Sequence, residues 1–429
     1  MSSAQNSSNW ITDDAQMVWH PYADPLLYAN PIPIVKAQGA YLFDEKGNRY
    51  IDAVSSWWTT LHGHSHPHIG KRIAEQQAQL DHVIFSGFTH QPAVELAKRL
   101  LARLPNNCKK IFYSDNGSTA VEVAIKMALQ YFFNLGQPRK RIIAFHGAYH
   151  GDTFGAMAVS ERNAFTTPFQ DLLFEVVFIE PPLKGKTQLA LEQIKAAIAE
   201  APTAAFIFEP LLQGTAGMLM HEADGLSELV AYCQSQGVLT IADEVMVGFG
   251  RTGKFFASEY LSVQPDLYCL SKGLTGGTMA LGITACTAQI ANAFNDVSAR
   301  VFFHGHSYTA NPIACASGLA SLDVFDTTDV MGQIQAIATA HQQFCSVIGN
   351  HKRVKVARTL GTVFALEVDA GNETSYFNQI RQLAYPYFLK QGILMRPLGN
   401  VLYILPPYCI STSDLQYIYN AIETFLNQL

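Results

Sequence analysis

Between residues 110 and 290, short apolar runs alternate with helical stretches, and this alternation restricts the fold more than any other feature of the sequence. Strands that are apolar throughout, with helices between them, are typical of a largely parallel sheet covered on both faces. The sequence therefore predicts an α/β fold whose large domain holds a mostly parallel seven-stranded sheet. The expected strands are 110–114, 141–145, 176–180, 204–208, 238–243, 267–270 and 281–286. The expected helices are 118–133, 189–200 and 222–236.

The two ends of the chain carry a different pattern. Residues 40–53 hold two alternating runs around E45-K-G-N48, a signal typical of a β-hairpin. After a long helix beginning near Pro312, strands are expected at 354–368 and 393–405, and helices at 375–391 and 413–427. This mix predicts a smaller α+β domain. We expect an N-terminal segment, 1–80, to join a C-terminal small domain, 326–429, around a large domain at 81–325.

Composition excludes several classes of protein. Of the 429 residues, 48% are hydrophobic and 15% are charged, and the net charge is −6, which argues against disorder and against a nucleic-acid-binding track. No apolar stretch approaches the ~20 residues of a membrane span. The N-terminus lacks the basic and apolar regions of a signal peptide. Seven scattered cysteines without a C-x-x-C pair predict reduced thiols. We expect a soluble cytoplasmic protein with room for an apolar subunit interface.

Two polar residues stand where predicted strands end: Asp243 and Lys272. The carboxyl ends of parallel strands meet at one edge of an open sheet, where such folds bind ligands. Apolar residues precede Lys272 and L-T-G-G follows it, so we expect desolvation to lower the pKa of its amine and make it nucleophilic. Asp243 suits the ring nitrogen of pyridoxal phosphate (PLP). The simpler interpretation, a solvated lysine and a helix cap, explains the pairing and the glycines less well.

A phosphate site is expected where D115-N-G-S-T119 follows a strand and opens a helix. Backbone N–H groups at a helix start bind phosphate well. An ordinary helix cap at Asn116 explains the same residues equally well. The segment F145-H-G-A-Y149 follows another strand, and we expect Tyr149 to stack on a flat cofactor ring, with strand-end packing as the alternative.

Two further patterns are weaker. G248-F-G-R-T-G253 has the glycine spacing of a dinucleotide-binding loop but lacks the strand and helix that such a loop needs on either side. His62, His64, His66 and His68 alternate along the chain, yet no nearby acid or cysteine completes a tetrahedral set. We interpret these histidines as loop and surface residues and expect no metal site.

Taken together, D243-E, S-K272-G-L-T-G-G, D-N116-G-S and Y149-H-G-D-T-F-G resemble the class III aminotransferases, a PLP-dependent transferase family of the aspartate-aminotransferase fold. The resemblance extends from about Trp19 to Tyr408. Further motifs make the chain most similar to the branch of the family that acts in biotin synthesis. These motifs are W19-H-P-Y22, S55-S-W57-W58, G248-F-G-R251-T-G, and M395-R396-P ahead of Y403-I-L-P-P-Y408.

The resemblance implies roles for individual residues. Lys272 and Asp243 are the expected catalytic pair, with Lys272 holding the cofactor covalently and Asp243 holding its ring nitrogen. The other expected cofactor contacts are Asn116, Gly117, Ser118, Tyr149, Glu209, His306 and Ser307. The expected substrate contacts are Tyr22, Trp57, Tyr149, Lys272, Gly305 and Arg396. Arg396 is the expected partner of a substrate carboxylate, since a guanidinium pairs with that group in a bidentate manner; a surface strand arginine is the alternative.

In this family the phosphate also receives a hydroxyl from the second subunit of a homodimer, within a segment H-G-P-T. The present chain reads H304-G-H306-S307, so Ser307 keeps the hydroxyl while His306 replaces the proline. A further departure is Leu398, which stands where many relatives carry an aromatic residue.

The implied activity is transamination of 8-amino-7-oxononanoate to 7,8-diaminononanoate, with S-adenosylmethionine or lysine as the amino donor. Two alternatives remain open. The first is another class III activity on ornithine, 4-aminobutyrate or a different ω-amino acid, or a decarboxylase of the same fold. The second is a non-catalytic protein of this fold that serves as a binding module.

Overall fold

A seven-stranded sheet forms the centre of the computed structural model, which describes residues 9–22, 24–28, 30–294, 300–371 and 378–429. Its strands lie in the order β4-β12-β11-β10-β7-β5-β6. β12 runs antiparallel to both of its neighbours, and the other pairs are parallel. The predicted α/β fold and mostly parallel sheet are confirmed. The strands are β4 (Cys108–Ser114), β5 (Arg141–Phe145), β6 (Val177–Ile179), β7 (Thr203–Phe208), β10 (Leu239–Asp243), β11 (Leu267–Leu270) and β12 (Gly282–Thr287).

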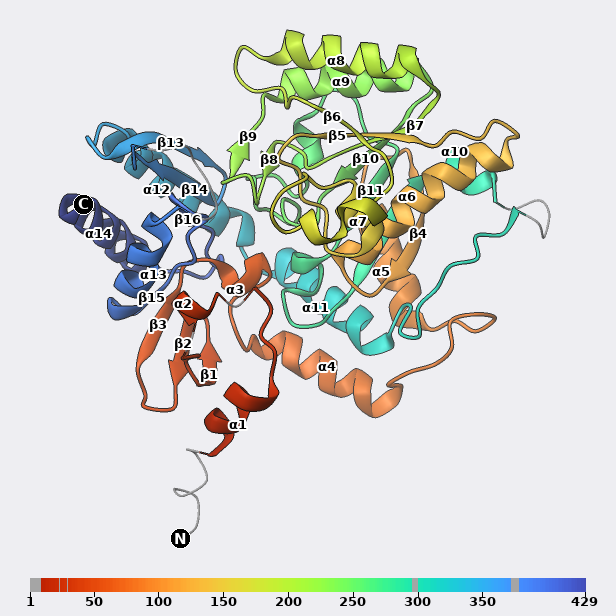
Figure 1. The fold of residues 1–429 in the computed structure, drawn as a ribbon. Helices are drawn as coiled ribbons and strands as arrows, with labels where there is room; N and C mark the ends of the chain where they lie inside the picture. Colours follow the sequence, from red (N-terminus) through yellow and green to blue (C-terminus); the bar gives the residue numbers. More distant parts are fainter. Residues whose placement is uncertain (1–8, 23, 29, 295–299, 372–377) are drawn as a thin grey trace.

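Both faces of this sheet are buried, which explains why its strands are apolar throughout. Along β5, Ile142 and Ala144 belong to the core cluster that contains helix α6 (Gly117–Asn134). Ile143 and Phe145, on the other face, belong to the cluster that contains α8 (Thr187–Glu200) and α9 (Ala223–Ser235). Figure 1 shows α8 and α9 side by side above the sheet. Successive side chains point to opposite faces, so one apolar run supplies both cores.

The N-terminal hairpin forms as predicted and then pairs with the C-terminal part of the chain. β1 (Ile34–Gln38), β2 (Tyr41–Asp44) and β3 (Arg49–Asp52) form an antiparallel meander. β3 also pairs in parallel with β15 (Ile393–Leu394), with Ile51 opposite Ile393. The N-terminal strands accordingly lie beside the C-terminal elements in Figure 1. The domain boundaries near residues 80 and 325 stay a prediction.

Two predicted C-terminal strands are wrong because each contains a turn. The segment 354–368 is a hairpin of β13 (Val354–Leu360) and β14 (Val363–Val368), joined through Gly361 at a φ of +56°. The segment 393–405 divides into β15 and β16 (Val401–Ile404), which belong to different sheets. β16 pairs with β14. Glycine and polar residues between the apolar runs interrupt the strands at these points.

The remaining elements surround these sheets. Two further short strands, β8 (Leu212–Gln213) and β9 (Leu219–Met220), pair with each other. The remaining helices are α1 (Asn9–Met17), α2 (Pro25–Tyr28), α3 (Ser55–Trp58), α4 (Pro67–Gln79), α5 (Gln91–Leu101), α7 (Phe154–Ala158), α10 (Ala288–Asn292), α11 (Pro312–Thr327), α12 (Val330–Ile348), α13 (Ile380–Lys390) and α14 (Thr412–Gln428). The predicted helix 375–391 is thus α13, and its first residues lie partly outside the described ones. In the described part of the chain, no helix combines the length and apolarity that crossing a membrane needs.

The alternating histidines are not all loop and surface residues, and for His62 that interpretation is wrong. His62 is buried, forms a hydrogen bond with Ser321 (3.0 Å), and burial lowers its pKa to about 3. His64 and His68 lie against the carboxylates of Asp52 and Asp323. Among the described residues, no cluster of three or more histidine, cysteine or acidic side chains could hold a metal ion.

Buried histidines make the stability of the fold depend on pH, and His341 on α12 offers the clearest test. Its Nε2 donates to the carbonyl oxygen of Thr362 (3.2 Å), and its Nδ1 accepts from the Tyr419 hydroxyl (2.7 Å). Burial lowers its pKa to about 3 from 6.5. Below pH 6.5 the imidazole of His341 is therefore protonated in the unfolded chain but stays neutral in the folded chain. Stability falls by up to about 1.4 kcal/mol per pH unit for this residue.

We expect His341→Gln to flatten this pH dependence, because glutamine can keep both hydrogen bonds without titrating. The measurement is the urea midpoint at pH 7.5 and at pH 5.5. The partly exposed His351, which lies beside Asn427, provides the matched control, since His351→Gln should lose as much stability on acidification as the wild type. Equal losses in His341→Gln and the wild type would contradict the assignment.

Candidate active site

The register of two parallel strands brings Asp243 and Lys272 to one edge of the sheet. β10 pairs with β11 so that Asp243 lies opposite Cys269, and Lys272 follows three residues later. Both residues line a cavity of about 660 Å³. Such carboxyl-terminal edges are the usual ligand sites of open α/β sheets. The predicted cofactor residues that share this cavity are Asn116, Gly117, Ser118, Tyr149, Glu209, Asp243 and Lys272.

Lys272 is held in a strained and desolvated position. Its φ is +41°, a left-handed conformation that costs a non-glycine residue of the order of 1–3 kcal/mol. Part of the side chain faces the cavity, and its Nζ lies 5.2 Å from the centre of the Trp58 ring. Burial lowers the pKa of the amine, and the nearby carboxylates of Asp243 and Glu209 oppose that shift. The result is an amine that loses its proton more readily than a solvated lysine.

Asp243 is fixed by a buried histidine that the sequence analysis did not select. His150 Nδ1 donates to Asp243 Oδ2 (2.7 Å), and the backbone N–H of Val245 donates to Oδ1 (3.1 Å). Both side chains are almost fully buried. His150 Nε2 is buried and has no hydrogen-bond partner within the described residues. His150 stands inside the quoted motif Y149-H-G-D-T-F-G, so a polar residue just after a strand was the available signal.

Glu209 lies next to this pair. It accepts hydrogen bonds from the backbone N–H groups of Tyr149 (3.2 Å) and Gly214 (3.0 Å). Burial and the charge of Asp243 raise its pKa to about 7, although the His150 ring lowers it. Glu209 is therefore a buried acid that fixes the backbone at Tyr149 and Gly214.

The proposed phosphate cradle combines both interpretations of its sequence. The Asn116 side chain caps α6 by accepting from the backbone N–H of Thr119 (3.0 Å). The first N–H groups of a helix have no intrahelical acceptor, so those of Gly117 and Ser118 can serve an anion in the cavity. A Cβ on Gly117 would lie 2.6 Å from Val245, so a glycine is needed at this close approach.

An adjoining cavity of about 550 Å³ holds the predicted substrate residues Tyr22, Trp57, Tyr149, Lys272 and Arg396. The Arg396 guanidinium lies 4.4 Å from the Trp57 ring centre, and its Nη2 donates to the carbonyl oxygen of Tyr22 (3.3 Å). It is therefore not the surface strand arginine of the alternative interpretation.

Two further residues of this second cavity were not selected from the sequence. The Tyr22 hydroxyl donates to the carboxylate of Asp152, and the Phe165 ring packs edge-on against Tyr22 at 6.0 Å. Burial, with the nearby Asp152 charge, raises the pKa of Tyr149. The cavity therefore has aromatic walls, with the Arg396 guanidinium as a cation and the Asp152 carboxylate as an anion.

The segment predicted to reach the phosphate does not line either cavity of this chain. Gly305 and Ser307 are exposed. His306 lies with its Nδ1 3.7 Å from Asp115 Oδ2 and its Nε2 3.2 Å from His304 Nε2. Asp115 directly precedes the Asn116–Gly117 cradle. The predicted cofactor contacts of this segment therefore stay predictions.

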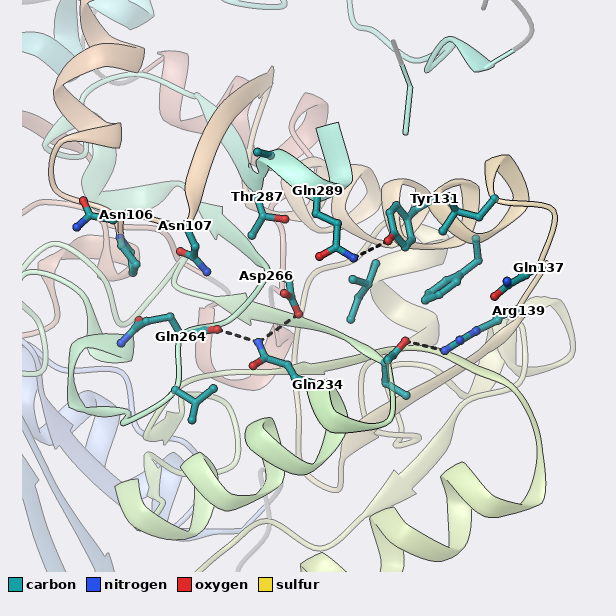
Figure 2. A pocket seen from close by; sticks show the side chains of 18 residues that line it. Asn106, Asn107, Tyr131, Gln137, Arg139, Gln234, Gln264, Asp266, Thr287 and Gln289 are labelled. Atoms are coloured by element: carbon teal, nitrogen blue, oxygen red, sulfur yellow. Dashed lines mark hydrogen bonds between the residues drawn. The ribbon is translucent and has the colours of Figure 1, made fainter. Parts of the chain in front are cut away.

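A third hollow, of about 900 Å³, lies at the opposite edge of the sheet, where β10 and β11 begin (Figure 2). Several of its polar groups already have partners. Asp266 accepts from Thr240 and Gln234, Gln234 also donates to the Gln264 carbonyl oxygen, and Arg139 donates to backbone carbonyl groups. We therefore place the chemistry at the carboxyl-terminal edge.

A desolvated lysine, a fixed carboxylate and a helix N-terminus around one cavity define a PLP-dependent transferase site. The chain matches the family Aminotransferase class-III over residues 26–426 and belongs to it. Among its relatives, the adenosylmethionine-8-amino-7-oxononanoate aminotransferase of Synechococcus elongatus is 45% identical, over 96% of this chain and 99% of that protein. The protein of the same name from Staphylococcus aureus is 34% identical, over 94% of each chain.

Solved structures agree with this assignment. The adenosylmethionine-8-amino-7-oxononanoate aminotransferase of Methanocaldococcus jannaschii superimposes with a TM-score of 0.92 at 33% identity, over 98% of both chains. A PLP-bound amine transaminase from an uncultivated Pseudomonas species superimposes with a TM-score of 0.87 at 28% identity, over 96% of this chain and 98% of that one. The predicted family, fold and PLP cofactor are thereby confirmed.

The site residues fit PLP on structural grounds. Within the described residues, the Lys272 amine has no hydrogen bond or ion pair, so it is available for a covalent bond with the cofactor. The N–H groups at the start of α6 suit a phosphate dianion. The Asp243 carboxylate, oriented by His150, suits a protonated ring nitrogen at the other end of the same cavity.

We expect Lys272→Met to lose transamination by about 10⁴-fold or more, because both the nucleophile and the proton carrier are removed. The urea midpoint of the cofactor-free protein should not fall, because methionine has a similar volume and buries no amine. Initial rates and denaturation curves measure both effects. Lys184 is exposed, so Lys184→Met is the control that should change neither. Near-normal turnover in Lys272→Met would overturn the assigned role.

Proposed function

We propose that this chain transfers an amino group to 8-amino-7-oxononanoate, forming 7,8-diaminononanoate for biotin synthesis. The observation that carries the proposal is Arg396, a guanidinium set among aromatic rings in the wall of the cavity that also contains Lys272. A long apolar chain with one terminal carboxylate has the matching chemistry. The names of the relatives from Synechococcus elongatus and Methanocaldococcus jannaschii support the same substrate.

The roles of the residues follow from their geometry. When bound, PLP supplies a carbonyl carbon that amines attack and a ring that accepts electrons from the substrate carbon. Lys272 would hold the cofactor through its amine, and the same amine, when free, would move a proton at the substrate carbon. Asp243, held by His150, keeps a proton on the ring nitrogen. Trp57, Tyr22 and Phe165 exclude water from the substrate chain, and Arg396 fixes its far end.

S-adenosylmethionine is the proposed amino donor. The names of the relatives support it, and the cavity offers the carboxylate of Asp152 as a counter-charge for a cationic donor. Lysine also carries a cationic group and is the second candidate.

Free cysteines throughout the described chain support a reducing, cytoplasmic location.

We further propose that the chain works as a homodimer in which Gly305, His306 and Ser307 reach the partner's cavity, with Ser307 donating to the phosphate. Exposed aromatic side chains surround this segment: Phe303 is 80% exposed and Tyr308 is 63% exposed. The Tyr308 ring lies 5.4 Å from the His82 ring, which brings segment 82–88, with exposed Ile84 and Phe88, to the same region. Such an apolar surface is typical of an interface between subunits.

The donor is tested by the visible absorption of the PLP-loaded protein. The band should bleach when S-adenosylmethionine is added, and 8-amino-7-oxononanoate should restore it. Arg396→Ala should raise the KM for the oxo acid by at least about tenfold, because a charged hydrogen bond is lost, and it should leave bleaching by the donor nearly unchanged.

Other outcomes separate the alternatives. Bleaching by lysine alone would change only the donor. Bleaching by ornithine or 4-aminobutyrate, without restoration by the oxo acid, would replace the proposed substrate within the same family. An equal loss of both half-reactions in Arg396→Ala would show that Arg396 is structural.

The dimer is tested by light scattering, which should give a mass of about twice 47.2 kDa. Phe303→Asp should shift the equilibrium toward monomer and weaken PLP retention, because a charge would be buried at the interface. Phe133 is 67% exposed at the end of α6, so Phe133→Asp is the matched control that should stay dimeric. A monomeric wild type that retains PLP would contradict the proposal.

A further inference from the structure

The guanidinium of Arg396 is enclosed between two aromatic rings from different parts of the chain. Its central carbon lies 4.4 Å from the Trp57 ring centre and 4.9 Å from the Tyr28 ring centre. Arginine stacks favourably on aromatic faces, and two such contacts restrict a side chain that is otherwise flexible. Within the described residues, its one hydrogen bond goes to the Tyr22 carbonyl oxygen, so other N–H groups remain for a ligand.

The position of Tyr28 is itself determined by helix α13. Tyr28 ends the single turn α2, and its ring packs edge-on against Tyr385 of α13, with centroids 4.9 Å apart at 81°. At the start of this turn, the Asp24 carboxylate forms an ion pair with Arg381 of α13, which is 4% exposed. The Asp24 carbonyl oxygen also accepts from the Tyr28 N–H (2.8 Å). The turn is therefore attached to α13 at both of its ends.

We infer that Tyr28 is a positioning residue that orients Arg396 for the carboxylate of the amino acceptor. This inference rests on the proposed role of Arg396 as the carboxylate partner. Tyr28 does not line the cavity, whereas Arg396 and Trp57 do, so Tyr28 acts on the substrate only through the guanidinium. A guanidinium already held in one plane loses less freedom when a carboxylate binds, and this raises affinity without a new contact to the substrate.

The test compares Tyr28→Ala with Tyr28→Phe in the PLP-loaded enzyme. Tyr28→Ala removes the ring, and the KM for 8-amino-7-oxononanoate should rise about fivefold to thirtyfold while kcat and the rate of bleaching by the donor stay within twofold. Tyr28→Phe keeps the ring and should restore the KM to within about threefold of the wild type. Tyr417 contacts the other end of α13 by donating to the Gln391 carbonyl oxygen (2.9 Å), so Tyr417→Ala is the control that should leave the KM unchanged.

Three outcomes would overturn the inference. The first is an unchanged KM in Tyr28→Ala. The second is a loss of both half-reactions together with a lower melting temperature in Tyr28→Ala, which would show that the ring only supports the fold. The third is a failure of Tyr28→Phe to recover the KM, because stacking on a ring does not need the hydroxyl.

A second measurement separates this inference from the proposed function. Nonanoate and nonanamide are added as competitors of the donor half-reaction, since they share an apolar chain and differ in charge. The wild type should prefer nonanoate by about tenfold or more, and Tyr28→Ala should reduce that preference. If Tyr28→Ala reduces the preference for nonanoate but the enzyme does not turn over 8-amino-7-oxononanoate, the positioning role would be upheld and the proposed substrate rejected. If the oxo acid is turned over but Tyr28→Ala leaves the preference for nonanoate unchanged, the proposed substrate would stand and the positioning role of Tyr28 would be rejected.

Discussion

The parallel pairing of β10 with β11 is the constraint on which the rest of the site depends. It sets Asp243 opposite Cys269, so that the acid and the lysine leave the sheet at one edge and face one cavity. A shift of one residue in this register would turn every side chain of the strand to the opposite face. Because both faces are buried, such a shift would place the wrong residues in both cores. The register that packs both faces of the sheet is therefore the same register that aligns Asp243 with Lys272.

The chain stabilises several unfavourable features at this edge. Lys272 is desolvated and has a left-handed backbone, and Glu209 is a buried acid. These features persist because the surrounding sheet and helices fix the backbone and supply hydrogen-bond donors, as the N–H groups of Tyr149 and Gly214 do for Glu209. Stability elsewhere in the fold offsets such local costs. His150 belongs to this arrangement, since its remaining nitrogen is buried without a partner in the described structure.

The sequence predicted the large sheet well because burial on both faces makes each strand a continuous apolar run. The same signal misled at 354–368, where Gly361 turns the chain inside an apolar stretch, and at 393–405, where Pro397 and Gly399 interrupt it. Motif residues located Lys272, Asp243 and Arg396. The contact between Tyr28 and Arg396 was beyond prediction, because it joins α2 to the segment that follows β15. Trp57 of α3 and Tyr385 of α13 complete the arrangement, and the proximity of these elements is a property of the folded chain. His62 was misjudged for the same reason, since its partner is Ser321.

The pairing of β3 with β15 has a consequence for the order of events during synthesis. Ile51 has no strand partner on that side until Ile393, 342 positions later, has been made. At about 5–20 residues per second, the N-terminal meander waits roughly 17–70 s on the ribosome with an open edge. All seven strands of the large sheet are complete during that interval. The cofactor cavity can therefore assemble before the chain can close the sheet that carries Arg396 next to it.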